Sequence, residues 1–121
     1  MSIQAKSAPN LNLPKGSRTC EISIINTTCD LVVPPGTLVE PKIPGHEYLN
    51  LPTVAFYIKH SSGAEVLFDM GCRSDWDNLV PHVAEVVSER VPGLRVTKDV
   101  PVTLKDGGVD PSNLKALILS H

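Results

Sequence analysis

Two side chains that are suited to metal or acid–base chemistry stand at the ends of apolar runs. Asp69 follows Val66–Phe68 and lies two residues before Gly71, and His121 follows Ala116–Leu119 after one intervening serine. Imidazole and carboxylate groups are common zinc ligands and proton carriers. An aspartate close to a glycine is also a frequent turn residue that accepts hydrogen bonds from its own loop. The residue types alone therefore leave both interpretations open.

The three cysteines fit neither a disulfide framework nor a structural zinc cluster. The number of cysteines is odd, and no pair among Cys20, Cys29 and Cys72 has the CxxC spacing. We therefore expect reduced thiols in an intracellular protein. Cys72 lies near the N-terminus of a helix that we expect to begin at Ser74. The dipole of that helix would lower the pKa of the Cys72 thiol. No partner base is in view, so the preferred interpretation of Cys72 is a small structural residue.

The other histidines offer no further ligand set. His46, His60 and His82 form no His-x-His pair, and we interpret them as surface residues without a chemical role. Trp76 is expected to anchor a helix in the core. No catalytic residue is predicted within this chain.

The first elements are a leader and one strand. Residues 1–18 are polar and broken by prolines, which indicates a flexible leader before a domain over 19–121. Residues 19–26 alternate, with Cys20, Ile22 and Ile24 on one side, which predicts a half-buried strand.

A hairpin is predicted in the middle of the chain. Residues 31–46 contain four prolines and two glycines, which favours an irregular connection. The apolar runs 49–60 and 65–69 are separated by Ser61–Gly63, a pattern that predicts two antiparallel strands.

One main helix is expected next. Apolar residues recur at helical spacing over 76–90, with Ser74 as the N-cap and Pro92-Gly93 after the end. Pro81 conflicts with an unbroken helix, so either the regular part begins near Pro81 or the helix is kinked.

The C-terminal third mixes weaker and stronger signals. Residues 94–104 suggest an extended stretch, and Asp110-Pro111 is typical of a capped helical turn that continues to Leu114. The apolar run 116–119 is typical of a strand buried on both faces.

Composition excludes several classes of function. The net charge is −2 and no Lys/Arg cluster occurs, which gives no electrostatic case for nucleic acid or an anionic membrane. No apolar run is long enough to span a bilayer, and the N-terminus lacks the apolar core of a signal peptide. A cytoplasmic protein is expected.

Four segments in order resemble the metallo-β-lactamase superfamily. Leu117–His121 is similar to the strand that enters its His-x-His-x-Asp-His motif, and Val66–Gly71 resembles its strand ending in Asp-Thr-Gly, with methionine replacing the threonine. Leu49–Pro52, which runs into an apolar strand, resembles the corresponding segment of acyl-homoserine lactonases, and Gly108–Lys115 resembles the short helical turn that precedes the histidine strand in the superfamily. The resemblance covers residues 49–121.

The resemblance implies an α+β fold, the N-terminal half of an αββα sandwich, with an antiparallel-rich sheet and one main helix. It also implies two zinc ions in a complete parent, bridged by hydroxide. His121 would be the first zinc ligand, and Asp69 would hold the metal loop from behind the ligands. The remaining ligands are absent from this sequence, so this chain alone is expected to bind no zinc and to be inactive.

The implied function of the complete parent is zinc-dependent hydrolysis of a small lactone or ester. Two alternatives stay open. The chain is either a non-catalytic truncated product or a small binding module that associates with itself through exposed sheet edges.

Overall fold

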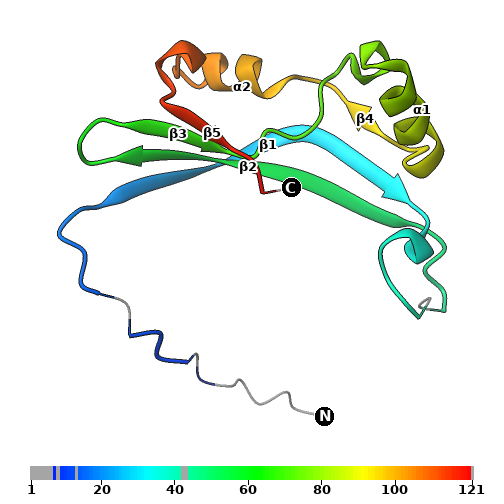
Figure 1. Ribbon diagram of the computed structural model, residues 1–121, viewed down its shortest axis with the longest axis horizontal. Coiled ribbons are helices and arrows are strands. Elements are labelled where there is room, and N and C mark those ends of the chain that lie inside the picture. Colours follow the sequence, from blue (N-terminus) through cyan, green and yellow to red (C-terminus); the bar gives the residue numbers. More distant parts are fainter. Residues whose placement is uncertain (1–6, 8, 13, 42–43, 121) are drawn as a thin grey trace.

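The computed structural model describes residues 7, 9–12, 14–41 and 44–120, which form a curled sheet with two α-helices on one side (Figure 1). The strands and helices are β1 (Cys20–Val33), β2 (Leu49–His60), β3 (Glu65–Phe68), α1 (Pro81–Arg90), β4 (Arg95–Val96), α2 (Val100–Asp106) and β5 (Ala116–Ile118). Three short 3-10 helices are η1 (Pro35–Thr37), η2 (Trp76–Asn78) and η3 (Pro111–Asn113). The chain therefore has an α+β architecture, as predicted.

The five strands are arranged in the order β4-β1-β2-β3-β5. Neighbouring strands are antiparallel except for β3 and β5, which are parallel. The β1–β2 pair is the longest: it runs from Cys20 opposite His60 to Val33 opposite Leu49, with an irregularity between Asn26 and Asp30. The expected antiparallel-rich sheet is confirmed.

The core lies between the sheet and α2. Ala55 and Leu67 on the sheet pack with Val100 and Leu104 of α2, and each of these four residues is at most 5% exposed. Successive side chains of a strand point to opposite faces, so this packing covers one face of the sheet. Burial of an aliphatic side chain contributes about 1.5–3 kcal/mol, so α2 is a main stabilising element.

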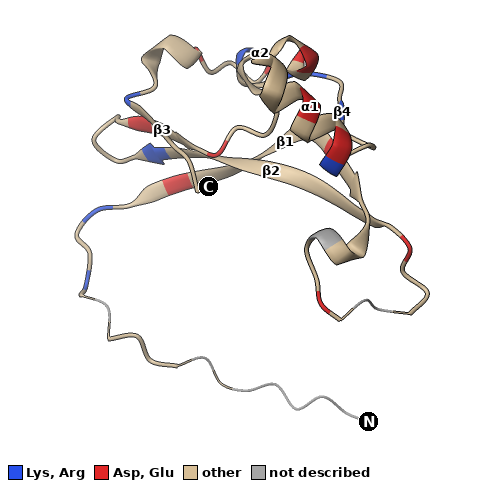
Figure 2. Cartoon of the chain, turned by 45° about the vertical axis from the view of Figure 1, so that its right-hand side comes forward, with Lys and Arg blue, Asp and Glu red and all other residues tan. Residues whose placement is uncertain are grey.

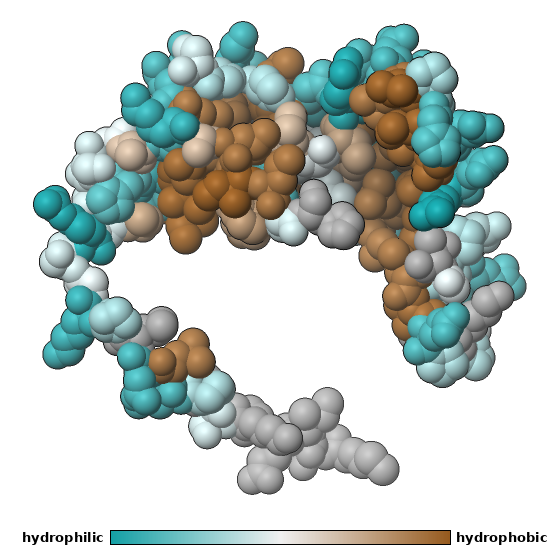
Figure 3. All heavy atoms as spheres, in the orientation of Figure 1, coloured by the Kyte–Doolittle hydropathy of each residue, from teal (hydrophilic) through white to brown (hydrophobic). Residues whose placement is uncertain are grey.

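The opposite face of the sheet is apolar and exposed within the described residues. Ile22 is 63% exposed, Ile24 70% and Val54 45%, and their strand partners place them on one face. We call this surface the uncovered face. Space-filling Figure 3 shows apolar side chains gathered over the sheet. The prediction that the Cys20, Ile22 and Ile24 side of residues 19–26 is half-buried is therefore wrong.

Helix α1 begins at Pro81, which is the first of the two possibilities that the sequence left open; the helix is not kinked there. The α-helix begins at Pro81, where a missing N–H costs little, and residues 76–78 form η2 instead of a first helical turn. Ser74 is consequently not an N-cap. Trp76 is only partly buried and lies outside the core cluster, so its predicted anchoring role is wrong.

Helix α2 replaces an expected extended stretch, and the sheet therefore carries two helices instead of one. The segment Asp99-Val100-Pro101 has an acid followed by a proline near the helix start, which is the same signal that correctly predicted η3 after Asp110. Burial of Val100 and Leu104 against the sheet stabilises the helical choice.

Two strand predictions need correction. β1 continues to Val33, three residues into the predicted irregular segment, because it pairs there with β2. β5 is exposed along its length rather than buried on both faces. It is an edge strand that pairs only with β3 in the described part of the chain.

No helix within the described ranges is long and apolar enough to cross a membrane. Figure 2 shows acidic and basic positions interspersed over the helices and loops, without a large patch of one sign in that view.

We predict that Gly71→Ala destabilises the protein more than Gly63→Ala. Both glycines have positive φ, where an L side chain costs about 1–2 kcal/mol. A Cβ at Gly71 would also lie 2.8 Å from Thr27 Cβ, whereas a Cβ at Gly63 would meet no atom within 4 Å. Urea denaturation should therefore give a loss of roughly 2–4 kcal/mol for Gly71→Ala and about 1 kcal/mol for Gly63→Ala. Equal losses would contradict the close contact with Thr27.

Candidate functional site

The candidate site begins where β3 and β5 end. Because these strands are parallel, with Phe68 opposite Ile118, their carboxyl ends meet at the same edge of the sheet. The next residue after β3 is Asp69, which adopts the left-handed conformation with a φ of 59°. Its backbone N–H donates to the Ile118 carbonyl at 2.8 Å. The strand ends are thus joined directly.

The Asp69 carboxylate holds Ser120 by two hydrogen bonds. Oδ1 accepts from the Ser120 backbone N–H at 2.8 Å, and Oδ2 accepts from Ser120 Oγ at 2.8 Å. We call this pair of bonds the Asp69–Ser120 clamp. Two bonds to one carboxylate fix the orientation as well as the position of the segment that follows β5.

The clamp bears on both interpretations of Asp69. Its two carboxylate oxygens accept hydrogen bonds from Ser120, which lies 51 positions further along the chain and outside the loop of Asp69. A carboxylate that orients the segment leading to a ligand has the geometry expected of a group behind a metal site. That role remains a prediction, because His121 itself lies outside the described residues.

The described residues do not fit a metal ion on their own. Within residues 7, 9–12, 14–41 and 44–120, no group of three or more His, Cys, Asp or Glu side chains is placed to hold one. Zinc needs three or four such ligands. The zinc ions implied by the resemblance therefore have no site in this part of the chain, and we derive no chemical step through them.

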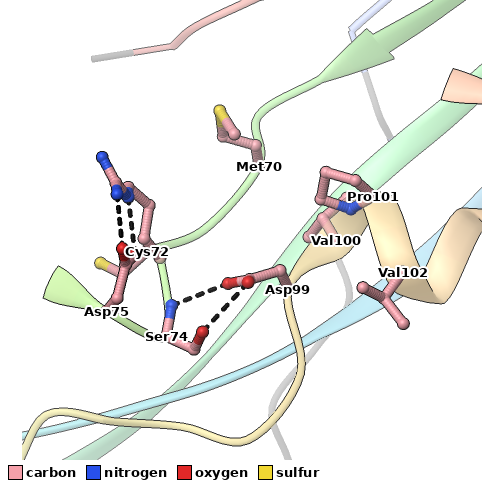
Figure 4. A pocket seen from close by; sticks show the side chains of 9 residues that line it. Met70, Cys72, Ser74, Asp75, Asp99, Val100, Pro101 and Val102 are labelled. Atoms are coloured by element: carbon pink, nitrogen blue, oxygen red, sulfur yellow. Dashed lines mark hydrogen bonds and ion pairs between the residues drawn. The ribbon is translucent and has the colours of Figure 1, made fainter. Parts of the chain in front are cut away.

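Beside the clamp, residues 70–75 and the start of α2 line a cavity of about 570 Å³ that is open to solvent on one side (Figure 4). We call Met70–Asp75 the 70–75 loop. It is tied to α2 through Asp99, whose carboxylate accepts from the Ser74 N–H at 2.7 Å and from Ser74 Oγ at 3.0 Å. Within the loop, Arg73 makes a bidentate ion pair with Asp75, at 2.8 and 2.6 Å.

Sequence reasoning missed this cavity and the role of Asp99. Ser74 and Asp99 are 25 residues apart, and no local pattern pairs them. Asp99 occupies the N-cap position of α2 but makes no side-chain cap bond there, because its carboxylate binds Ser74. The Asp-x-Pro pattern was the available signal for the helix, although not for the contact.

The structure contradicts the idea of an activated thiol at Cys72. No α-helix begins at Ser74, so no helix dipole lowers the pKa. Partial burial of the thiol and the neighbouring Cys29 instead raise the pKa of Cys72 to about 11, although the residue as a whole is exposed. The thiol is protonated near neutral pH, which makes it a poor nucleophile.

The other histidines lie on other elements: His46 in the segment before β2, His60 at the end of β2 and His82 in α1. His46 and His82 are exposed, and His60 is half-buried. His60 Nδ1 lies 2.7 Å from Ser62 Oγ in the turn after β2. His46 and His82 are therefore surface residues, as predicted, whereas His60 is not fully exposed; that none of the three has a chemical role stays a prediction.

Comparisons with known proteins cover nearly the whole chain. It is 34% identical over 119 residues to gamma-lactamase FDB1 of Fusarium pseudograminearum, and 30% identical over 123 residues to metallo-hydrolase mfmC of Annulohypoxylon moriforme. These matches span 93% and 96% of this chain. The resemblance to metallo-β-lactamase-type proteins is confirmed. No family model matches the chain.

The matches cover a minor part of each relative. The chain spans 29% of the length of the gamma-lactamase and 31% of that of the metallo-hydrolase. It also matches cytochrome P450 monooxygenase mpaDE of Penicillium brevicompactum, with 31% identity over 98% of this chain but only 14% of that protein. Most of each relative thus lies outside the match.

We predict that alkylation of Cys72 follows a midpoint near pH 11. Only the thiolate reacts, and a raised pKa lowers its fraction at every pH below that value, so roughly one thiol in ten thousand is ionised at pH 7. The measurement is the iodoacetamide rate against pH in a Cys20→Ser variant, with Cys20→Ser/Cys72→Ala as the control. A midpoint at or below that of a free thiol would contradict the shift.

Proposed function

We propose that this chain is part of a metal-dependent hydrolase that opens a lactone or a related cyclic ester. In that reaction water adds to the carbonyl carbon, the ring C–O bond breaks, and the proton ends on the released oxygen to give a hydroxy acid. The Asp69–Ser120 clamp is the observation that carries the proposal. The name of one relative, a gamma-lactamase, supports hydrolysis of a cyclic acyl compound, and the name of another, a metallo-hydrolase, supports a metal-dependent reaction.

In this proposal Asp69 is a positioning residue. Its two hydrogen bonds fix the Ser120 backbone, and so they orient the residue that follows. His121 would then present its imidazole to a metal as the first ligand, with the remaining ligands supplied from outside this chain. Zinc is the metal that we propose for the complete protein, and this chain alone would neither bind it nor catalyse the reaction.

The two-faced sheet supports an αββα sandwich for the complete domain. One face is packed against α2, while the uncovered face exposes Ile22, Ile24 and Val54. Large apolar surfaces are usually covered by another layer. We propose that a second sheet covers this face, that residues 19–121 belong to this domain, and that residues 1–18 are a leader outside it.

The surroundings of the protein are part of the same proposal. Three free cysteines favour a cytoplasmic location. The interspersed charges in Figure 2 favour a small molecule over nucleic acid or a membrane as the partner.

We predict that, in the longer protein that carries this chain, Asp69→Ala lowers kcat/KM for γ-butyrolactone about 10- to 100-fold. Loss of a group that orients metal ligands through hydrogen bonds typically has an effect of this size. Asp106→Ala, which removes an exposed carboxylate paired with Lys98 at 2.8 Å, is the matched control and should stay within about twofold. Metal content by mass spectrometry should fall in Asp69→Ala and not in Asp106→Ala. Undiminished hydrolysis after metal removal would refute the proposal.

A second candidate function is self-association of a non-catalytic chain. The uncovered face and the exposed edge strand β5, where Leu117 and Ile118 are 45% and 44% exposed, favour it. Such surfaces promote association between copies.

If the 121-residue chain associates through the uncovered face, Ile24→Lys should shift it to monomers in sedimentation velocity. Val83→Lys, on the exposed side of α1, is the control and should leave the association unchanged. A monomeric unsubstituted chain would rule out this second candidate.

A further inference from the structure

The cavity between the 70–75 loop and α2 is lined in large part by apolar side chains. Met70, Val100, Pro101 and Val102 contribute to its lining (Figure 4). Its volume of about 570 Å³ falls within the range of roughly 300–1,000 Å³ that is typical of small-molecule sites. A ligand group of several carbon atoms therefore has room in it.

The charged groups at the rim are already paired with protein partners. Both oxygens of the Asp99 carboxylate accept hydrogen bonds from Ser74. The Arg73 guanidinium donates two bonds to Asp75, and Asp75 holds the pKa of Arg73 above its usual value. Arg73 supplies one positive charge at the rim and Asp75 and Asp99 supply two negative charges, so an anionic group would meet no net attraction, whereas a neutral group would leave these hydrogen bonds undisturbed.

The cavity also adjoins the candidate site through the chain itself. Met70, which lines it, directly follows Asp69 of the clamp. A molecule whose reacting group lies at the carboxyl ends of β3 and β5 can therefore extend toward this cavity.

We propose that this cavity binds the neutral, apolar substituent of the substrate, so that the substrate class is a cyclic acyl compound carrying an alkyl or aryl group. The proposal rests on the proposed function for the reacting group. Ser74 and Asp99 act as positioning residues, since their hydrogen bonds hold the 70–75 loop against α2.

The test measures binding and needs no hydrolysis. The sequence has two methionines, so ¹³C-methyl-methionine NMR of the 121-residue chain reports on Met70, assigned with Met70→Leu. The probes are 2-methyl-, 2-butyl- and 2-hexyltetrahydrofuran, which are neutral and lack a carbonyl group. The Met70 signal should shift saturably, with affinity rising about threefold to fourfold for each added methylene.

Two matched variants decide whether the probe occupies the cavity. Val102→Trp places an indole at the cavity and should weaken binding of the hexyl probe at least tenfold. Val83→Trp is the control, because Val83 is about as exposed as Val102 (44% and 46%) but does not line the cavity. This control substitution should change the affinity for the hexyl probe less than twofold.

Absence of a saturable Met70 shift, or equal weakening by both tryptophan variants, would overturn the proposal. Binding by the cavity without lactone hydrolysis in the longer protein would keep the binding site and refute the proposed reaction. Lactone hydrolysis by the longer protein, without binding at Met70 that strengthens with the length of the alkyl chain, would keep the proposed reaction and refute the binding site.

Discussion

The parallel pairing of β3 with β5 is the constraint on which the site depends. Parallel neighbours bring their carboxyl ends to one edge of a sheet, and here they bring Asp69 within hydrogen-bond distance of Ser120. β5 has only three residues and an open edge, so its own pairing holds its end weakly. The Asp69 carboxylate supplies the missing restraint, and it does so through a backbone in the left-handed conformation. An exposed strand end thereby becomes an ordered one.

A second pair of hydrogen bonds from a serine to one carboxylate fixes the neighbouring 70–75 loop. Asp99 holds Ser74 through its backbone N–H and its hydroxyl, just as Asp69 holds Ser120. The 70–75 loop and its cavity lie between the Asp69–Ser120 clamp and the Asp99–Ser74 contact. The buried Val100 and Leu104 fix α2 against the sheet. The candidate site and the cavity are therefore positioned by one packed face, and the opposite face stays available for another layer.

Local signals predicted the elements whose formation is decided locally. The runs 49–60 and 65–69 became β2 and β3, and the Asp110 cap bonds to the Ser112 N–H as expected. Failures arose where tertiary contacts decide: Val100–Asp106 is helical because it packs on the sheet, and Ala116–Ile118 is exposed because nothing in the described part of the chain covers it. The pairing of Ser74 with Asp99 leaves no trace in sequence spacing. Asp69 could be singled out from its motif, but its partner Ser120 could not.

Amide hydrogen exchange of Ser120 tests most directly whether the Asp69 carboxylate holds the end of β5. In Asp69→Ala the Ser120 amide loses its acceptor, and we expect its exchange to accelerate roughly tenfold, as for loss of a hydrogen bond to a charged group. The Lys115 amide, which donates to the Glu65 carbonyl at 2.8 Å, is the internal reference and should keep its rate. Unchanged exchange at Ser120, or equal acceleration at both amides, would contradict the clamp.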